Sequence, residues 1–399
     1  STSTVAFIDD STIESGGDVQ VDAREKNEVA AYAGAVAASF GGKEKSDAVG
    51  VGAAIAVNTI FNDRGTQASI DDSEITSGGE VHVDAATANM ITTLGFGSAL
   101  VLSSQSRALA LGTSIGVNHI KTTTWSRIRG DKQRTSVDAS GDISVEAEDD
   151  SLISAYAGAV GIAFGFKSNA SAVGASLVFN TIQSDVIATA DDVDLTSSSG
   201  NITIAATDSA EINAVAIGAT ITVAAAQDTA SSLAGAGSGI YNRIRMDVQA
   251  TVQEGSVLTA TSGGVTVKAQ DYSEISSDAG GVALAVGVSG QGTGAVVAVG
   301  AGIAINSIRN NVHAVVDDSR IVADGDVLVR ATSGDDPDSE SEFRIDALAL
   351  GAASAVGSIG LALSGAGAEA SNVIDNNVLA SIRDSRGTDS CLLYTSDAA

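Results

Sequence analysis

The chain lacks most of the residues that build a thick protein core. Aromatic side chains make up 4 % of its 399 residues, proline occurs once (Pro337) and cysteine once (Cys391). Large aromatic side chains contribute the greatest buried area per residue, so their scarcity argues against ordinary globular domains. The apolar content comes mainly from Ala, Val and Ile, which suit thin, closely stacked β-layers. A hydrophobic fraction of 44 % also excludes a disordered chain.

Basic residues are few as well. The chain has 21 Lys and Arg against 49 Asp and Glu, which gives a formal net charge of −28. Such a surface repels nucleic acids and anionic lipids, so neither is expected as a partner. The excess of carboxylates favours solubility and allows divalent cations to gather loosely around the molecule.

The single cysteine lies in a tail that differs from the rest of the chain. Residues 391–399 have the sequence CLLYTSDAA, which looks like translated read-through of a sequencing adapter. We therefore set residues 387–399 apart from the fold. The remaining chain has no cysteine and hence no disulfide framework. Because the chain opens inside a repeat, with STSTVAFIDD, we expect both native ends to lie outside it.

Internal repetition is the strongest signal in the sequence. An Asn followed two residues later by Ile, as in VNTI and YNRI, recurs at intervals of 60 to 66 residues. The six anchors are Asn58, Asn118, Asn180, Asn242, Asn306 and Asn372. A second anchor, a Gly turn followed by an alternating segment such as GGEVHVDA, keeps the same register. It ends at Ala23, Ala85, Ala147, Ala206, Ala269 and Ala331.

The anchors define a unit of about 62 residues. Each unit has a short strand, an acidic turn, a second short strand, a Gly turn, a strictly alternating strand and two long Ala/Gly/Val segments. The units are about 1–63, 64–123, 124–185, 186–247, 248–311 and 312–377, and a seventh begins at 378–386. Gly, Asp, Asn and Ser separate the segments, and no helical stripe is present. The pattern predicts an almost wholly β chain.

Such a unit can bury its apolar face only against the next copy. We therefore expect an all-β, right-handed parallel β-helix or β-solenoid. Comparison with known β-helix repeats favours three coils of roughly 20 residues per unit. Six units would then form a rod on the order of 90 Å long, because coils rise by about 4.8 Å. Two larger coils per unit remain open, and so do stacked β-hairpins.

The Asn anchors have two interpretations. Stacked asparagines can form amide ladders. With three coils per unit, however, equivalent asparagines would lie about 14 Å apart. A local cap that satisfies a turn is therefore the favoured interpretation.

Two segments, 281–305 and 347–368, are long and uncharged enough to resemble membrane spans. The equivalent stretch of the first unit carries Lys43, Glu44, Lys45 and Asp47. One repeat position should not be buried in lipid in one copy and charged in another. We expect these segments to be strands, and no membrane insertion by this chain.

No catalytic or metal-binding residue is expected. The acidic turns Asp9-Asp10, Asp71-Asp72, Asp191-Asp192 and Asp317-Asp318 supply too few oxygens for Ca²⁺, which favours solvated turns. They recur at one repeat position, as structural turns do, and His82, His119 and His313 share no position. The acidic insertion DDPDSESEF (335–343) is best explained as a tolerated surface loop. No cofactor is implied, and the ligand-binding residues stay unknown.

Segments such as AVGVGAAIAVNTI and SGGEVHVDA resemble the repeats of leukotoxin-family filamentous adhesins, which are akin to filamentous haemagglutinins. The resemblance covers residues 1–386. It implies export by two-partner or autotransporter secretion and display at a bacterial cell surface. It also implies a structural and adhesive role, with a host or cell-surface protein or glycan as ligand and neighbouring repeats as partners. Two alternatives stay open: an exported β-helix polysaccharide enzyme and a calcium-stabilised solenoid.

Overall fold

The computed structural model describes residues 3–42, 47–62, 64–334, 344–387 and 391–393. Throughout this part of the chain every regular element is a β-strand, which confirms the expected all-β class. The strands form three sheets, and neighbours in each sheet run parallel. The insertion at 335–343 and the turn residues Lys43, Glu44 and Lys45 lie outside the described residues.

Each unit contributes strands to all three sheets. Sheet A contains β1 (Thr4–Asp9), β4 (Ala48–Phe61), β5 (Thr66–Asp71), β8 (Ala108–Arg129), β11 (Ala170–Asp191), β15 (Ser232–Gln253), β19 (Gly294–Ile308), β20 (Asn311–Asp317), β24 (Gly360–Ile374) and β25 (Asn377–Arg383). Sheet B contains β2 (Thr12–Ser15), β6 (Glu74–Ser77), β9 (Thr135–Ala139), β12 (Val193–Ser197), β16 (Val257–Ala260), β21 (Arg320–Ala323) and β26 (Arg386–Gly387). Sheet C contains β3 (Val19–Gly41), β7 (Val81–Ser103), β10 (Ile143–Phe166), β13 (Ile202–Asp208), β14 (Glu211–Ala226), β17 (Val265–Asp271), β18 (Glu274–Ser289), β22 (Val327–Ser333), β23 (Ile345–Gly357) and β27 (Cys391–Leu393).

One unit makes one circuit of the three sheets, which we call a coil. The chain passes from β7 in sheet C to β8 in sheet A and β9 in sheet B, and returns to sheet C as β10, which pairs with β7. Val81 of β7 thus lies beside Ile143 of β10. The expectation of three coils per unit, or two, is wrong. The alternating segment and the first Ala/Gly/Val segment join without a turn, and β7 and β10 each continue for more than 20 residues.

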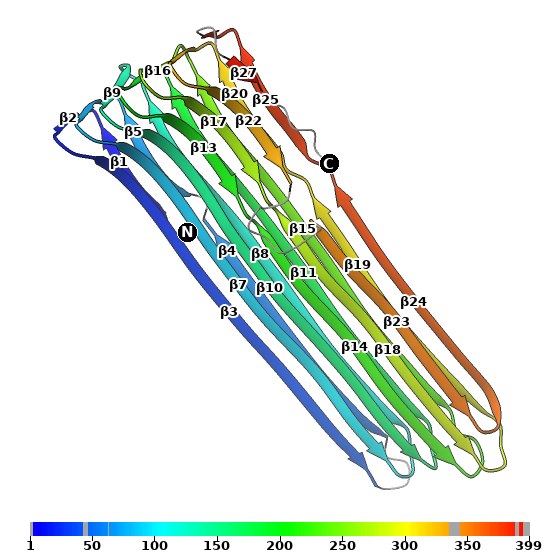
Figure 1. Cartoon of the computed structure of the whole chain (residues 1–399). Helices are drawn as coiled ribbons and strands as arrows, with labels where there is room; N and C mark the ends of the chain where they lie inside the picture. The colour runs from blue at the N-terminus through cyan, green and yellow to red at the C-terminus, as the bar shows by residue number, and fades with distance from the viewer. Residues whose placement is uncertain (1–2, 43–46, 63, 335–343, 388–390, 394–399) are drawn as a thin grey trace.

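The long dimension of the molecule runs along the strands. A strand of 23 residues such as β7 spans about 76 Å, whereas six coils stack over only about 29 Å. Figure 1 shows the long strands side by side, with the two termini on opposite sides of the stack. The expected 90 Å rod is therefore wrong. The two long segments of one unit lie in different sheets and pair with neighbouring units, which the hairpin alternative does not provide.

The core differs between the two ends of the molecule. At the three-sheet end, where sheet B joins sheets A and C, buried Ile, Val and Leu side chains such as Ile70, Ile143 and Leu195 fill the interior. At the opposite, two-sheet end, the buried hydrophobic residues are almost all Ala, as in Ala110, Ala172 and Ala224. The interior therefore narrows from a filled core to a thin layer between sheets A and C.

Inward glycines allow the sheets to meet at the two-sheet end. A Cβ at Gly97 would clash with the carbonyl oxygen of Thr113 on the facing sheet, and a Cβ at Gly112 would clash with that of Val160. Equivalent clashes recur at Gly218, Gly281 and Gly351 in later coils. The scarcity of large side chains in the sequence follows from this close approach of two backbones.

The apolar segments that resemble membrane spans form β18, β19, β23 and β24, as expected for strands. Among the described residues, no helix is long and apolar enough to cross a membrane. Three residues of the tail that we set apart, Cys391–Leu393, continue sheet C by pairing with Val327–Val329.

Candidate functional site

The six anchor asparagines form one continuous ladder through the interior. They occupy a single column of sheet A, with Asn58 beside Asn118 and each later anchor beside the next. The Nδ2 of each asparagine donates to the Oδ1 of the next at 2.8–3.0 Å. The favoured interpretation as local turn caps is therefore wrong. It failed because one coil per unit places equivalent residues on adjacent strands.

The ladder is also supported from the facing sheet. The Nδ2 of Asn58 donates to the Oγ1 of Thr93 at 2.6 Å, and the Nδ2 of Asn306 donates to the Oγ of Ser277 at 2.8 Å. The side chains of Asn118, Asn180 and Asn242 are almost fully buried. A buried amide in this setting is costly unless it is paired. The ladder therefore fixes the register of the coils.

A second buried column carries acidic side chains that the sequence did not reveal as a group. Asp149, Asp208 and Asp271 lie on successive coils of sheet C, pair directly in register and are fully buried. Each stands two residues after a second-anchor alanine, so the repeat alignment could have found them. They were missed because aspartate is normally a surface residue.

The partners of these three carboxylates differ. Thr122 donates to Asp149 at 2.8 Å, and Ser273 donates to the Oδ2 of Asp208 at 3.0 Å. Among the described residues, Asp271 is the only one of the three with a cationic partner, since the Nη2 of Arg344 lies 2.8 Å from its Oδ2. The Oδ1 of Asp208 is buried without a hydrogen-bond partner.

Their pKa values diverge for this reason. Burial raises the pKa of Asp149 to about 6. Burial, together with the charges of Asp271 and Asp149, raises the pKa of Asp208 well above its ordinary value. Burial also acts on Asp271, but Arg344 and the surrounding hydroxyls outweigh it and leave its pKa lowered. The column thus holds two carboxyl groups whose proton affinity is raised by burial beside one salt-bridged carboxylate.

The acidic turns are turns, as expected, but they are not all solvated. The second Asp of each pair adopts a left-handed backbone, with φ between 41° and 50° at Asp10, Asp72, Asp192 and Asp318. Such angles favour Gly, Asn and Asp, which explains the recurring residue. Asp9 and Asp10 are exposed, whereas Asp71 and Asp72 are buried. Residues 131–133 of the next coil cover the second turn, so the expectation of a solvated turn is wrong there.

Asp72 organises this covering loop. Its Oδ1 accepts hydrogen bonds from the backbone N–H groups of Asp131 (2.7 Å), Lys132 (2.8 Å) and Gln133 (3.2 Å). These donors lower the pKa of Asp72 to about 2. The neighbouring Asp71 is bound by Arg127 at 3.0 Å. Both carboxylates are occupied within the chain.

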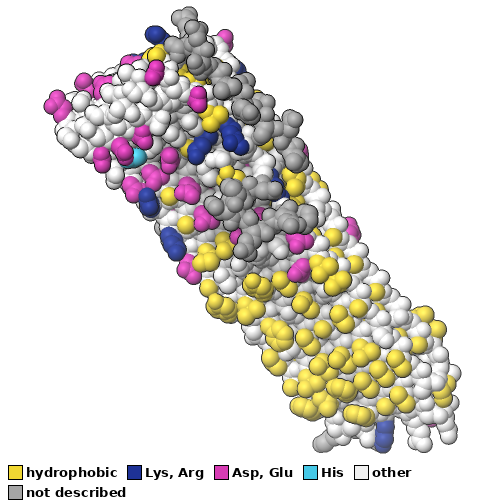
Figure 2. Space-filling model, in the orientation of Figure 1, with side chains coloured by type: hydrophobic (Ala, Val, Ile, Leu, Met, Phe, Trp, Pro, Cys, Tyr) yellow, Lys and Arg dark blue, Asp and Glu magenta, His cyan; other side chains and the backbone are white. Residues whose placement is uncertain are grey.

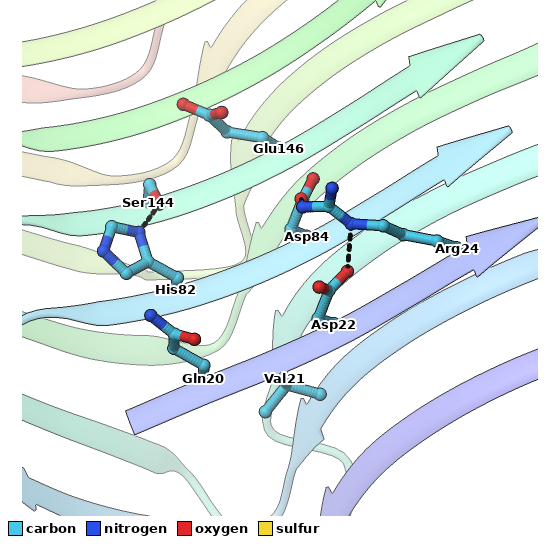
Figure 3. A pocket seen from close by; sticks show the side chains of 8 residues that line it. All are labelled: Gln20, Val21, Asp22, Arg24, His82, Asp84, Ser144 and Glu146. Atoms are coloured by element: carbon cyan, nitrogen blue, oxygen red, sulfur yellow. Dashed lines mark hydrogen bonds and ion pairs between the residues drawn. The ribbon is translucent and has the colours of Figure 1, made fainter. Parts of the chain in front are cut away.

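The outer face of sheet C bears a polar groove near the three-sheet end (Figure 3). Arg24 lies 2.8 Å from Asp22 and 2.9 Å from Asp84, and His82 lies 2.6 Å from the Oγ of Ser144. The groove encloses about 210 Å³, less than the roughly 300–1,000 Å³ of ligand pockets. Its charged groups bind each other, which suits an outer strand surface better than a catalytic site.

The single tryptophan lies on the outer face of sheet A. Trp125 and the exposed Phe7 line a shallow groove together with Gln67. The guanidinium of Arg127 lies 4.2 Å from the centre of the Trp125 ring and occupies that face. A sugar ring would have to displace this arginine before it could stack on the indole.

No group of His, Cys, Asp or Glu side chains in the described ranges has the arrangement of a metal site. His82 and His313 make separate hydrogen bonds, to Ser144 and Asn377. His119 is on a third strand, and burial lowers its pKa. No family model, curated protein or solved structure matches the chain.

Proposed function

We propose that the chain is a non-catalytic structural and adhesive segment of a secreted or cell-surface bacterial filament of the filamentous-adhesin type. Its fold in this proposal is a closed, right-handed parallel β-solenoid with one coil per unit. The asparagine ladder supports the proposal most strongly, because it continues through six coils and shows that the coils share one architecture. A reaction centre would need a coil that departs from the others.

The shape suggests how such a segment works. One coil rises about 4.8 Å but uses about 62 residues. Each repeat therefore lengthens the stack of coils only slightly, but it adds a large outer surface. The segment presents two broad faces, sheets A and C, to a host or cell-surface ligand, either protein or glycan. Further repeats of the same chain would continue the sheets at β3 and β23.

Binding of the full chain to arrays of glycans and extracellular-matrix proteins tests the adhesive role. We expect saturable binding to at least one class of ligand, and none by heat-unfolded chain. An absence of binding to every arrayed ligand contradicts the adhesive role. Release of reducing sugar ends from any arrayed polysaccharide contradicts the non-catalytic role and favours the polysaccharide enzyme.

A further inference from the structure

The outer surface of sheet C at the two-sheet end is apolar over a large, flat area. We name it the tip face: the outward side chains of residues 32–40, 94–102, 156–164, 215–223, 278–286 and 348–356. These thirty positions are all described and carry one charge, that of Asp278. Figure 2 shows hydrophobic side chains gathered over the half of the molecule toward this end, and charged side chains over the other half.

The tip face has the size of a protein interface. Its five columns of outward residues are about 6.6 Å apart, and six coils at about 4.8 Å cover the other direction. The face therefore covers roughly 950 Å², whereas a stable complex needs about 800 Å² from each partner. On the first coil, Tyr32, Val36 and Phe40 are more than 70 % exposed.

One column of the tip face alternates between small and large residues. Register pairing aligns Gly34, Phe96, Gly158, Ile217, Gly280 and Leu350 on successive coils. A Cβ added at Gly34 or Gly280 would meet no atom within 4 Å. The fold itself does not need glycine at these two positions, and glycine weakens a strand. At Gly34 and Gly280 the column therefore presents open holes between large side chains, whereas the ring of Phe96 lies close to Gly158.

The column is complementary to itself when its order is reversed. Facing positions would be Gly34 with Leu350, Phe96 with Gly280, and Gly158 with Ile217. Every large side chain then meets a glycine. A two-fold axis parallel to the long strands produces this reversal, because it preserves strand direction and inverts the order of coils.

A column of charged residues on the outer face of sheet C, at the three-sheet end, also favours the reversed coil order. Asp22, Asp84 and Glu146 lie on the first three coils, and Lys268 and Arg330 lie on the last two. Reversing the coil order brings acidic residues toward basic ones. A two-fold axis along the coil stack would preserve the coil order, but it would reverse the strands and move this column away from its copy.

We propose that the tip face pairs with the tip face of a second copy of this chain, in a two-fold dimer with reversed coil order. A lipid surface suits the face less well. The net charge of −28 repels anionic lipid headgroups. The dimer does not depend on the adhesive role proposed above.

Sedimentation of the full chain under reducing conditions tests the proposal. We expect a concentration-dependent dimer of twice 39.5 kDa. Ile217→Lys and Gly280→Leu should each raise its dissociation constant at least about 30-fold, the size of a hot-spot loss. Leu177→Lys and Ile303→Lys, at similarly exposed positions on the outer face of sheet A, should leave it unchanged.

A charge exchange tests the reversed order. Lys268→Glu should weaken the dimer, and the added Asp84→Lys should restore it. Unfolding temperatures of all variants, measured in parallel, identify any that misfold. A monomer at every concentration overturns the proposal, and so does an open-ended series of oligomers that ignores the tip-face changes. Sedimentation with neutral phospholipid vesicles that is lost in Ile217→Lys, while the chain stays monomeric, also overturns it in favour of lipid.

Discussion

Asn180 donates from its Nδ2 to the Oδ1 of Asn242, 62 residues further along the chain, at 2.8 Å. The two side chains are buried and belong to adjacent strands of sheet A. This contact joins the sequence repeat to the coil, because it exists only if one unit makes one circuit.

Removing the middle of the ladder should destabilise the fold. Asn180→Ala leaves the amide of Asn118 without its acceptor and Asn242 without its donor, inside the buried interior. We expect a loss of about 1–3 kcal/mol in the free energy of unfolding. Asn372→Ala at the exposed end of the column is the matched control and should cost less. Guanidinium unfolding followed by circular dichroism measures both, and equal losses would contradict a buried ladder.

The buried acids should make the fold more stable in mild acid than at neutral pH. The folded pKa of Asp149 is about 6 against an ordinary 3.8, so the folded state binds the extra proton between these values. The stabilisation that this proton provides is complete below about pH 3.8 and is lost as the pH rises through 6. The free energy of unfolding changes over this range by on the order of 3 kcal/mol. Asp208 acts in the same direction. Asp271 acts oppositely, and its stabilising effect is lost only as the pH falls from 3.8 toward its lowered folded pKa.

Melting temperatures between pH 4.5 and 8 test this behaviour. We expect the transition to fall as the pH rises. Asp208→Asn, which keeps the shape of the protonated group, should raise the transition at pH 8 and flatten the profile. A profile that rises toward pH 8 in the unaltered chain would contradict raised pKa values for these carboxyl groups.

The contact between sheets A and C should tolerate no added methyl group. Gly112→Ala directs a Cβ at the carbonyl oxygen of Val160, and we expect a loss of about 1–3 kcal/mol. Gly237 lies on the outer face of the same sheet, where a Cβ meets nothing within 4 Å. Gly237→Ala should therefore be neutral or slightly stabilising. Chemical denaturation of the two variants side by side decides between a tight and a loose layer.

The buried turn at Asp72 should matter more than its counterparts. Glycine accepts the left-handed backbone. Asp72→Gly therefore removes the carboxylate and the three hydrogen bonds that it accepts from backbone N–H groups, and leaves the turn itself unchanged. We expect a lower melting temperature and faster proteolysis near residues 130–134. Asp318→Gly is the control at an exposed turn. Because the pKa of Asp72 is about 2, its contribution should disappear only as the pH falls from 3.8 toward that value.

The sequence predicted most of the strands and the repeat spacing, because both follow from patterns that recur in every unit. The left-handed turn at Asp72 and the alternation of Val81 and Val83 are visible within a few residues. The number of coils per unit depends on whether polar residues near Glu25 and Asn27 form a turn. They continue β3 instead, since Glu25 and Asn27 point inward and bind Asn62 and Asn89. That outcome depends on contacts between units, which no local pattern reveals.

For the same reason, the sequence revealed some of the residues of the candidate sites but not the way in which they lie together. The anchor asparagines were found as a repeat, but their ladder requires the coil number. The alternation from Gly34 through Phe96 to Leu350 becomes visible only after equivalent residues are aligned coil by coil.

The distance between two spin labels measures directly whether one unit makes one coil. Val57→Cys and Ile305→Cys place labels in one exposed column of sheet A, four units apart, and Cys391→Ser removes the native thiol. Dilution with unlabelled chain suppresses contacts between molecules. We predict a backbone separation of about 19 Å in pulsed electron paramagnetic resonance. A separation of about 58 Å, as three coils per unit require, would contradict a fold with one coil per unit.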